Sequence, residues 1–302
     1  PSGIEGLVFN TRRAIFADWR VREALIQAFN FELINTTITG GTAPRITSYF
    51  SNSVLGMAPG EPATGAVRAL LAPFAAELLP GALEGYSLPV SDGTEANRKG
   101  LRAATKLLAE AGWTVQDGVL KDGAGRVFAF EILLVQGADE MLSLSNIYAE
   151  ALKRLGIAAR ITLVDSAQYK ERTNAYDFDM THYVRSLSLS PGNEQMLYWG
   201  HEGVQTPGMR NWMGMNSPAA ESLIQTMLTA ASREDFIDAT RGLDRVLTSG
   251  RYVIPIWYAG VSRLAHDGAL KYPARLPIYG DWLGFLPDVW WFEDQEQDGK
   301  KE

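Results

Sequence analysis

Two residue types that often build reactive sites are scarce in this 302-residue sequence, which has no cysteine and only three histidines. The absence of cysteine excludes disulfide bonds, thiolate nucleophiles and cysteine-bound metal ions. It is compatible both with the cytoplasm and with a bacterial envelope compartment in which free thiols would be oxidised. His182, His201 and His266 form no His-x-x-x-His pair, so no metal site is expected from them.

An excess of positive charge and long apolar runs are also missing. The 28 Lys and Arg residues are outnumbered by 35 Asp and Glu residues, which gives a formal net charge of −7. Without a basic stripe, nucleic-acid binding is not expected as a main function. No run of apolar residues approaches the length that a membrane-spanning helix needs.

Sequence motifs of common catalytic sites are absent as well. The chain has no Gly-x-Ser-x-Gly elbow, no Ser-x-x-Lys pair and no Gly-x-x-x-x-Gly-Lys phosphate loop. Asp177 and Asp179 are spaced to share one face of a strand, but an acid–base pair would need a further partner elsewhere in the chain. We therefore interpret these two residues as solvated charges, and catalysis finds no support.

What the sequence does contain is an alternation of strand-like and helical segments. Residues 128–135, 141–155 and 159–165 read as strand, helix and strand, which predicts a βαβ unit with two parallel strands. Asp165 is placed to cap a short helix, and residues 178–184 supply another strand. The sheet is thus expected to be at least partly parallel.

Helix signals are also clear near the start of the chain and weaker after it. Asp18 and Asn30 are placed to cap two successive helices, and Gly40 to end the second. Residues 42–93 are rich in Gly and Pro, which indicates long loops around one helical patch that Pro73 interrupts. Residues 115–128 predict a hairpin with Gly-rich turns.

The stretch YVRSLSLSPGNEQMLYWGHEG, residues 183–203, combines small polar residues with flanking aromatic residues. It begins at the carboxyl end of a predicted strand, where open α/β sheets place their ligands. A ligand cleft and a plain surface turn are both compatible with this composition. A second group in Gly- and Pro-rich sequence again mixes rings with polar groups, so it could line a cleft or pack in the core: Tyr198, Trp199, Arg210, Asn211 and Trp212.

The order of motifs resembles that of a known family. A strand ending in FNTRR is followed by FADWRVREALIQAFNFELI, and later come LLAEAGW, EALKRLGI, VDSAQY and LDRVLTSGRYVIPIWY. These motifs are individually weak but jointly specific, and they run from about Gly6 to Tyr258. They resemble the oligopeptide-binding proteins of ABC importers, extracellular solute-binding protein family 5, and SYFSNS, SLSPGNEQ, YWG and PGMRNW resemble its YejA-like branch. The positions that match the family's entry into its second lobe are Asn10, Asp18, Arg20, Val21, Arg22, Ala24 and Asn30.

This resemblance implies an α/β fold: a type II periplasmic-binding-protein-like lobe with a mixed, partly parallel sheet flanked by helices. Residues 1–260 would form the second, C-terminal lobe, and residues 261–292 would return to a first lobe that is mostly absent from this chain. The start without methionine agrees with a missing N-terminal half. Residues 293–302 are charged and lack apolar side chains, so we expect a disordered tail.

The resemblance also implies a function. The protein would be periplasmic and would capture oligopeptides between two lobes for delivery to the membrane permease subunits of an ABC importer, without a cofactor and without catalysis. The polar ligand contacts are expected from Arg185, Ser186, Ser188, Asn193, Glu194 and Arg210, and the aromatic walls from Tyr183, Tyr198, Trp199 and Trp212. A secreted hydrolase of peptides or glycans and an interaction module without a small ligand remain alternatives.

Charge distinguishes this sequence from many peptide binders of the family. They offer an acidic residue to the free amine of the ligand, whereas this chain has Ser186, Ser188 and Ser190 there. Arg185 and Arg210 instead suggest a carboxylate-bearing group, unless Glu194 or Asp179 pairs with them. Asp18, Arg20 and Arg22 are assigned to structure, as a cap and a charged helix face.

Overall fold

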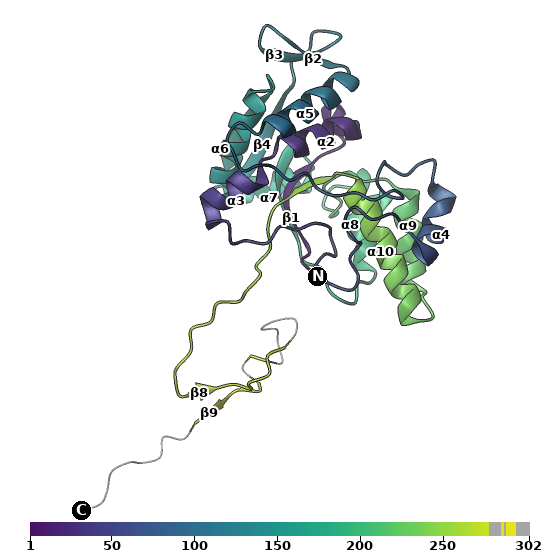
Figure 1. The fold of residues 1–302 in the computed structure, drawn as a ribbon, viewed down its shortest axis with the longest axis vertical. Coiled ribbons are helices and arrows are strands. Elements are labelled where there is room, and N and C mark those ends of the chain that lie inside the picture. The colour runs from purple at the N-terminus through teal and green to yellow at the C-terminus, as the bar shows by residue number, and fades with distance from the viewer. Residues whose placement is uncertain (278–284, 287, 294–302) are drawn as a thin grey trace, which may run out of the picture. The chain divides into compact units, whose positions relative to one another are not determined.

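Residues 1–277, 285–286 and 288–293 are described by the computed structural model, and the chain divides into two units, Pro1–Tyr258 and Ala259–Glu302 (Figure 1). The described part of the second unit contains a short antiparallel pair, β8 (Leu270–Lys271) and β9 (Trp291–Phe292). The tail predicted to be disordered, residues 293–302, lies outside the described residues except for Glu293.

The first unit is built on a five-stranded mixed sheet with the order β5-β4-β6-β1-β7. β4 is parallel to β5 and β6, whereas β1 is antiparallel to β6 and β7. The predicted partly parallel sheet is therefore confirmed. The strands are β1 (Ile4–Phe9), β4 (Ala129–Val135), β5 (Ala158–Val164), β6 (Met180–Arg185) and β7 (Val253–Pro255).

The predicted βαβ unit is also confirmed, with α6 (Asp139–Lys153) connecting β4 to β5. Because β4, β5, β6 and β7 all run in one direction, their carboxyl ends lie at the same edge of the sheet, called here the carboxyl edge. β1 runs the opposite way and begins at this edge, where Ile4 pairs with Arg185. The carboxyl edge is thus where the loop after β6 emerges.

Two apolar cores lie on opposite faces of the sheet, because side chains alternate along each strand. On β1, Leu7 and Phe9 enter one core, while Ile4 and Val8 enter the other. The helices whose residues fill the first core group around β4 in Figure 1, and those of the second lie apart from them. Each fully buried Leu or Phe contributes about 2 kcal/mol to this packing.

The first core is covered by α1 (Ala14–Ala17), α2 (Trp19–Ala28), α3 (Phe31–Thr39), α5 (Arg98–Glu110) and α6. The predicted caps are confirmed: the Asp18 carboxylate accepts from the Arg20 N–H and the Asn30 amide oxygen from the Leu33 N–H. Gly40 ends α3 in the left-handed conformation with φ 70°, which a side chain would strain.

The second core is covered by α4 (Gly65–Leu71), α8 (Glu194–Trp199), α9 (Pro218–Leu228) and α10 (Arg233–Ser249). Pro73 ends α4 in a 3-10 turn, Ala72–Phe74, as predicted. A further 3-10 turn, His201–Val204, follows α8.

The predicted cap and hairpin outside these layers are also present. Asp165 caps α7 (Ser166–Asn174), and the predicted hairpin is β2 (Trp113–Gln116) with β3 (Val119–Asp122).

The stretch predicted as one loop, residues 183–203, is instead interrupted by α8. The Glu194 carboxylate accepts a hydrogen bond from the Gly192 N–H at 2.8 Å, which holds the first turn of this helix. Gln195 and Trp199, one turn apart, are both buried. Apolar packing therefore makes a helix where the composition suggested only a turn.

Candidate binding cleft

The loop after β6 lies beside the place where the chain enters the first unit. Gly3 has φ 69°, and a Cβ atom there would be 2.6 Å from the backbone oxygen of Arg185. The Ser2 hydroxyl lies 2.7 Å from that of Ser51, which fixes the entering segment. The chain leaves the unit beyond β7 at the same carboxyl edge, because β7 runs parallel to β6.

Arg185 is the charged group at the centre of this region. Its guanidinium lies 4.5 Å from the ring centroid of Tyr198 and 5.1 Å from that of Tyr183, and its Nε donates to the Tyr183 hydroxyl at 3.3 Å. Within the described part of the chain, neither Arg185 nor Arg210 forms an ion pair. The suggested pairing with Glu194 or Asp179 is therefore not formed. Stacking on the rings leaves in-plane N–H groups of Arg185 available to a carboxylate.

The aromatic residues form a continuous group beneath Arg185. The ring of Tyr183 lies 5.7 Å from that of Trp212, which lies 5.9 Å from that of Phe178. Burial raises the pKa of the Tyr183 hydroxyl, and the nearby charges of Arg185 and Arg210 offset only part of that rise. Tyr183 therefore stays neutral and can accept the hydrogen bond from Arg185.

Two of the predicted aromatic walls, Tyr183 and Trp199, are fully buried. Tyr183 holds Arg185 through its hydroxyl and presents no ring face to a ligand. The Trp199 indole N–H donates to the Gln195 side chain at 2.8 Å, and the Trp199 ring packs against Tyr49 and Tyr198. The sequence-based prediction placed it on the wall of the cleft. In the structure Trp199 supports Tyr198 from within the core instead, because a completely packed ring presents no face to a ligand.

The predicted polar contacts are more exposed. Ser186, Ser188 and Asn193 lie at the surface, and the Ser188 hydroxyl accepts from the Ser190 N–H at 3.1 Å. Burial alone would raise the pKa of the Glu194 carboxyl, but hydrogen bonds from Gly192 and Gln195 outweigh it and leave the pKa lowered. Glu194 therefore stays ionised while it holds the start of α8.

Arg12 positions the segment that carries Arg210 and Trp212, a role that the sequence analysis missed. Its guanidinium donates to four backbone oxygens between residues 203 and 212, at 2.6–3.1 Å, and lies 3.7 Å from the ring centroid of Tyr176. An arginine bound mainly to carbonyl groups has no sequence signature, because its acceptors depend on the backbone course of a distant loop.

The structure changes two roles that were assigned to charged residues from the sequence. Arg22 does not lie on a charged helix face: it is 3% exposed and donates to the backbone oxygens of Phe16, Ala17 and Gly250. Its structural role stands, but it is a buried link between α2 and the end of α10. Arg20, by contrast, is bound to the capping residue Asp18.

The second change concerns the carboxylates that precede β6. Asp177 and Asp179 are not simply solvated, since both pair with Arg13, and Arg172 also binds Asp177. They lie at the opposite edge of the sheet from Arg185. They are therefore structural ion pairs and do not join the candidate cleft.

Comparison with known proteins decides the family. The profile of the family described as "Bacterial extracellular solute-binding proteins, family 5 Middle" matches residues 1–206. The chain belongs to this family. The resemblance noted from the order of motifs is thereby confirmed. Among the described residues, no helix has both the length and the apolar character that crossing a membrane requires.

The matches to curated relatives cover nearly the whole length of this family 5 chain. It is 41% identical over 297 residues to "Peptidoglycan-binding protein YepA" of Agrobacterium fabrum, covering 96% of this chain and 46% of the relative. It is 36% identical over 290 residues to "Probable peptide-binding protein YejA" of the same organism, covering 95% of this chain and 46% of the relative. The chain thus spans about half the length of the curated relatives it matches.

Solved structures show the same fold at lower identity. The oligopeptide-binding protein AppA from Bacillus subtilis, solved with a nonapeptide, matches with a TM-score of 0.63 and 20% identity over 84% of this chain and 44% of AppA. NikZ from Campylobacter jejuni, solved with Ni(L-His), matches with a TM-score of 0.64 and 15% identity over 85% of this chain and 45% of NikZ. The first unit therefore has the fold of one lobe of a periplasmic binding protein.

Proposed function

We propose that this chain is the C-terminal lobe of a two-lobed periplasmic protein that captures oligopeptides. The observation that carries the proposal is Arg185, a cation stacked on two rings at the carboxyl edge without a carboxylate partner among the described residues. The start of β1 and the end of β7 both lie at this edge. A second lobe connected at these two points would close over Arg185.

The ligand class follows from the charge of the cleft. Arg185 would bind a carboxylate of the peptide, with Arg210 adding positive charge nearby, while Ser186, Ser188 and Asn193 would bind main-chain groups. Tyr198 and Trp212 are the half-buried rings that remain available as walls. The name of one relative supports peptides, and that of another points to peptidoglycan, whose short peptides carry free carboxylates. Peptides of that kind are the first candidates.

The proposed mechanism is hinge closure. The peptide would bridge the two lobes, and the closed form would dock on the permease subunits of an ABC importer. Residues 261–292 would return to the first lobe, whose remainder belongs to the missing N-terminal half. No cofactor takes part. No observation favours the alternative hydrolase, because Asp177 and Asp179 are tied to arginines away from the cleft.

Two measurements test this function. Native mass spectrometry of the protein from its own source should give a mass about twice that of the chain, with a peptide-sized adduct that is lost on denaturation. Calorimetry on the two-lobed protein should show that Arg185→Met weakens binding of a carboxylate-bearing peptide about 10- to 100-fold, because a hydrogen-bonded ion pair is lost. The amidated form of the same peptide should bind wild type and variant alike. Turnover of the peptide, or equal affinity of wild type and Arg185→Met for both forms, contradicts the proposal.

A further inference from the structure

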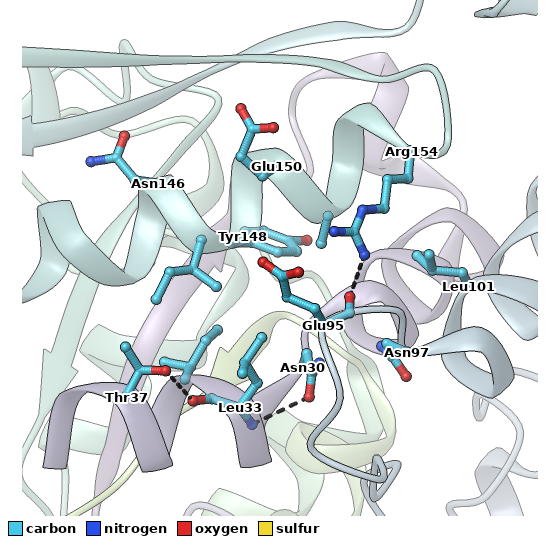
Figure 2. Close-up of a pocket in the computed structure, with 13 residues that line it drawn as sticks. Asn30, Leu33, Thr37, Glu95, Asn97, Leu101, Asn146, Tyr148, Glu150 and Arg154 are labelled. Atoms are coloured by element: carbon cyan, nitrogen blue, oxygen red, sulfur yellow. Dashed lines mark hydrogen bonds between the residues drawn. The ribbon is translucent and has the colours of Figure 1, made fainter. Parts of the chain in front are cut away.

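A separate cavity of about 380 Å³ opens between α3, α5, α6 and the segment before α5 (Figure 2). Its volume is in the range of sites for small organic molecules. The floor is apolar, and the residues that form it are Leu33, Ile34, Leu101, Ile147 and Ala151. An occupant would therefore place a hydrocarbon group against this floor.

This pocket is distinct from the peptide cleft. α6 begins at the carboxyl edge with Asp139, whereas the pocket is lined by its second half and by Arg154 just beyond it. Asp139 and Ala151 are twelve positions apart on this helix, which corresponds to about 18 Å at 1.5 Å per residue. A small ligand in the pocket would not reach the loop after β6.

Several polar groups around the pocket are already used by the fold. The Asn30 side chain donates to the Thr94 backbone oxygen and accepts from the Leu33 N–H. Asn97 donates to the backbone oxygen of Gln27, and Thr37 donates to that of Leu33 (Figure 2). These contacts shape the rim and leave little bonding capacity for a ligand.

Other polar groups remain available. The Glu95 carboxylate points toward the middle of the pocket in Figure 2. Neither this carboxylate nor the side-chain amide of Asn146 forms a hydrogen bond with a residue that the structure describes. Glu150 has only Lys153 at 3.8 Å, with both side chains more than 70% exposed. Arg154 donates to the backbone oxygen of Glu95 and so anchors the segment that carries this carboxylate.

The backbone next to Glu95 is held in an unfavourable conformation. Asn97 has φ 35°, in the left-handed region that favours glycine. Gly100 lies against it so closely that a Cβ atom there would be 2.6 Å from the Asn97 amide. Backbone strain of this kind tends to persist where the surrounding structure fixes a functional geometry. The position of the rim is thus fixed by packing.

We propose that this pocket binds a primary amine carried on an apolar stem. The stem lies on the apolar floor, and the ammonium group is held by the Glu95 carboxylate, while Glu150 and Asn146 lie on the exposed rim of the pocket. The lining contains two carboxylates, Glu95 and Glu150, and one guanidinium, Arg154, which is engaged by the Glu95 backbone oxygen, so the pocket favours a cation over an anion. The class of ligand is an amphipathic organic cation.

Titration of the two-lobed protein with three probes of equal stem length tests the site. n-Hexylammonium should saturate the pocket at least about tenfold more tightly than 1-hexanol or hexanoate, since only the ammonium pairs with Glu95. Glu95→Gln should weaken hexylammonium about tenfold and leave hexanol unchanged. Glu171→Gln, at an exposed carboxylate on α7 outside the pocket, is the matched control and should bind like wild type.

A second variant tests the location. Ala151→Leu extends a side chain over the apolar floor from within α6, with only a small loss of helix propensity, and should abolish hexylammonium binding. If Ala151→Leu is unstable, the hexylammonium affinity of Glu95→Gln still tests the proposal. The proposal is overturned if hexylammonium shows no saturable binding, if hexanoate binds equally well, or if Glu95→Gln keeps the affinity of wild type.

Discussion

Arg251 and Arg185 occupy two regions that are alike in their aromatic surroundings and different in charge. The guanidinium of Arg251 lies 4.9 Å from the ring centroid of Trp19 and 4.3 Å from that of Tyr86. Its Nε also donates to the Glu23 carboxylate at 2.7 Å, and both partners are at least nine-tenths buried. This region is a complete site: two rings, a carboxylate and a cation.

Arg185 repeats the aromatic part of that arrangement without the carboxylate. It lies over the rings of Tyr183 and Tyr198 and is only half-buried. Its polar contact within the described chain is the hydroxyl of Tyr183. Stacking on aromatic rings alone therefore does not make an arginine structural. The missing carboxylate at Arg185 is the position that a ligand would fill.

The largest expected effect is on stability at the complete site. Arg251→Met leaves the buried Glu23 carboxylate without its cation, so the free energy of unfolding should fall by about 3–5 kcal/mol. Arg185→Met, the matched change at the incomplete site, should alter it by no more than about 0.5 kcal/mol. Urea denaturation of both variants measures the difference. Equal losses would mean that the two arginines have the same role.

A smaller effect on the free energy of unfolding is expected at Asp244. Among the described residues this buried carboxylate has no arginine as an ion-pair partner, just as Arg185 has no carboxylate. It accepts hydrogen bonds from the Ser48 hydroxyl and from the N–H groups of Phe50 and Met57. Burial raises its pKa from 3.8 to about 6 despite these bonds. Between those two values the folded state binds the extra proton, so the contribution of Asp244 to stability falls as pH rises through about 6.

Measured unfolding free energies should show this dependence. From pH 5 to pH 7.5 the wild type should lose about 1.4 kcal/mol relative to Asp244→Asn, in which no carboxyl titrates. Carboxyl groups with lowered pKa values, such as those of Asp18 and Asp122, act in the opposite direction but cancel in the difference. A constant difference between wild type and variant across this range would show that Asp244 is ionised throughout.

The smallest expected effect concerns the ring that holds Arg185. Tyr198→Leu removes one of the two cation–π contacts and leaves the hydrogen bond to Tyr183, so Arg185 becomes less well oriented. Affinity for a carboxylate-bearing peptide should fall about three- to fivefold in calorimetry on the two-lobed protein, equivalent to about 0.6–1 kcal/mol. Tyr258→Leu, a half-buried tyrosine with no part in this stack, serves as the control. A loss as large as that of Arg185→Met would mean that Tyr198 contributes as much to ligand binding as Arg185 and would contradict this order of effects.

Local features of the fold were predictable because their causes lie within a few residues. The caps Asp18, Asn30 and Asp165 bind N–H groups two or three positions ahead, so their patterns are visible in any window of the sequence. The α8 helix was missed because its signal depends on burial of Trp199 against Tyr49, which is distant in the chain. The loop after β6 was recognised because its strand precedes it directly.

The alternation of strands and helices, the partly parallel sheet and the family could be predicted from the sequence, because hydrophobic periodicity, caps and motif order are local properties of the chain. Which charges are satisfied could be seen only in the folded chain. Glu23 and Arg251 are 228 positions apart, and Arg12 meets its acceptors about 200 positions away. Whether a cation finds a buried partner depends on such distant contacts. In the described chain Arg12, Arg22 and Arg251 hold the lobe together through such contacts, and we propose that Arg185 is left for a ligand.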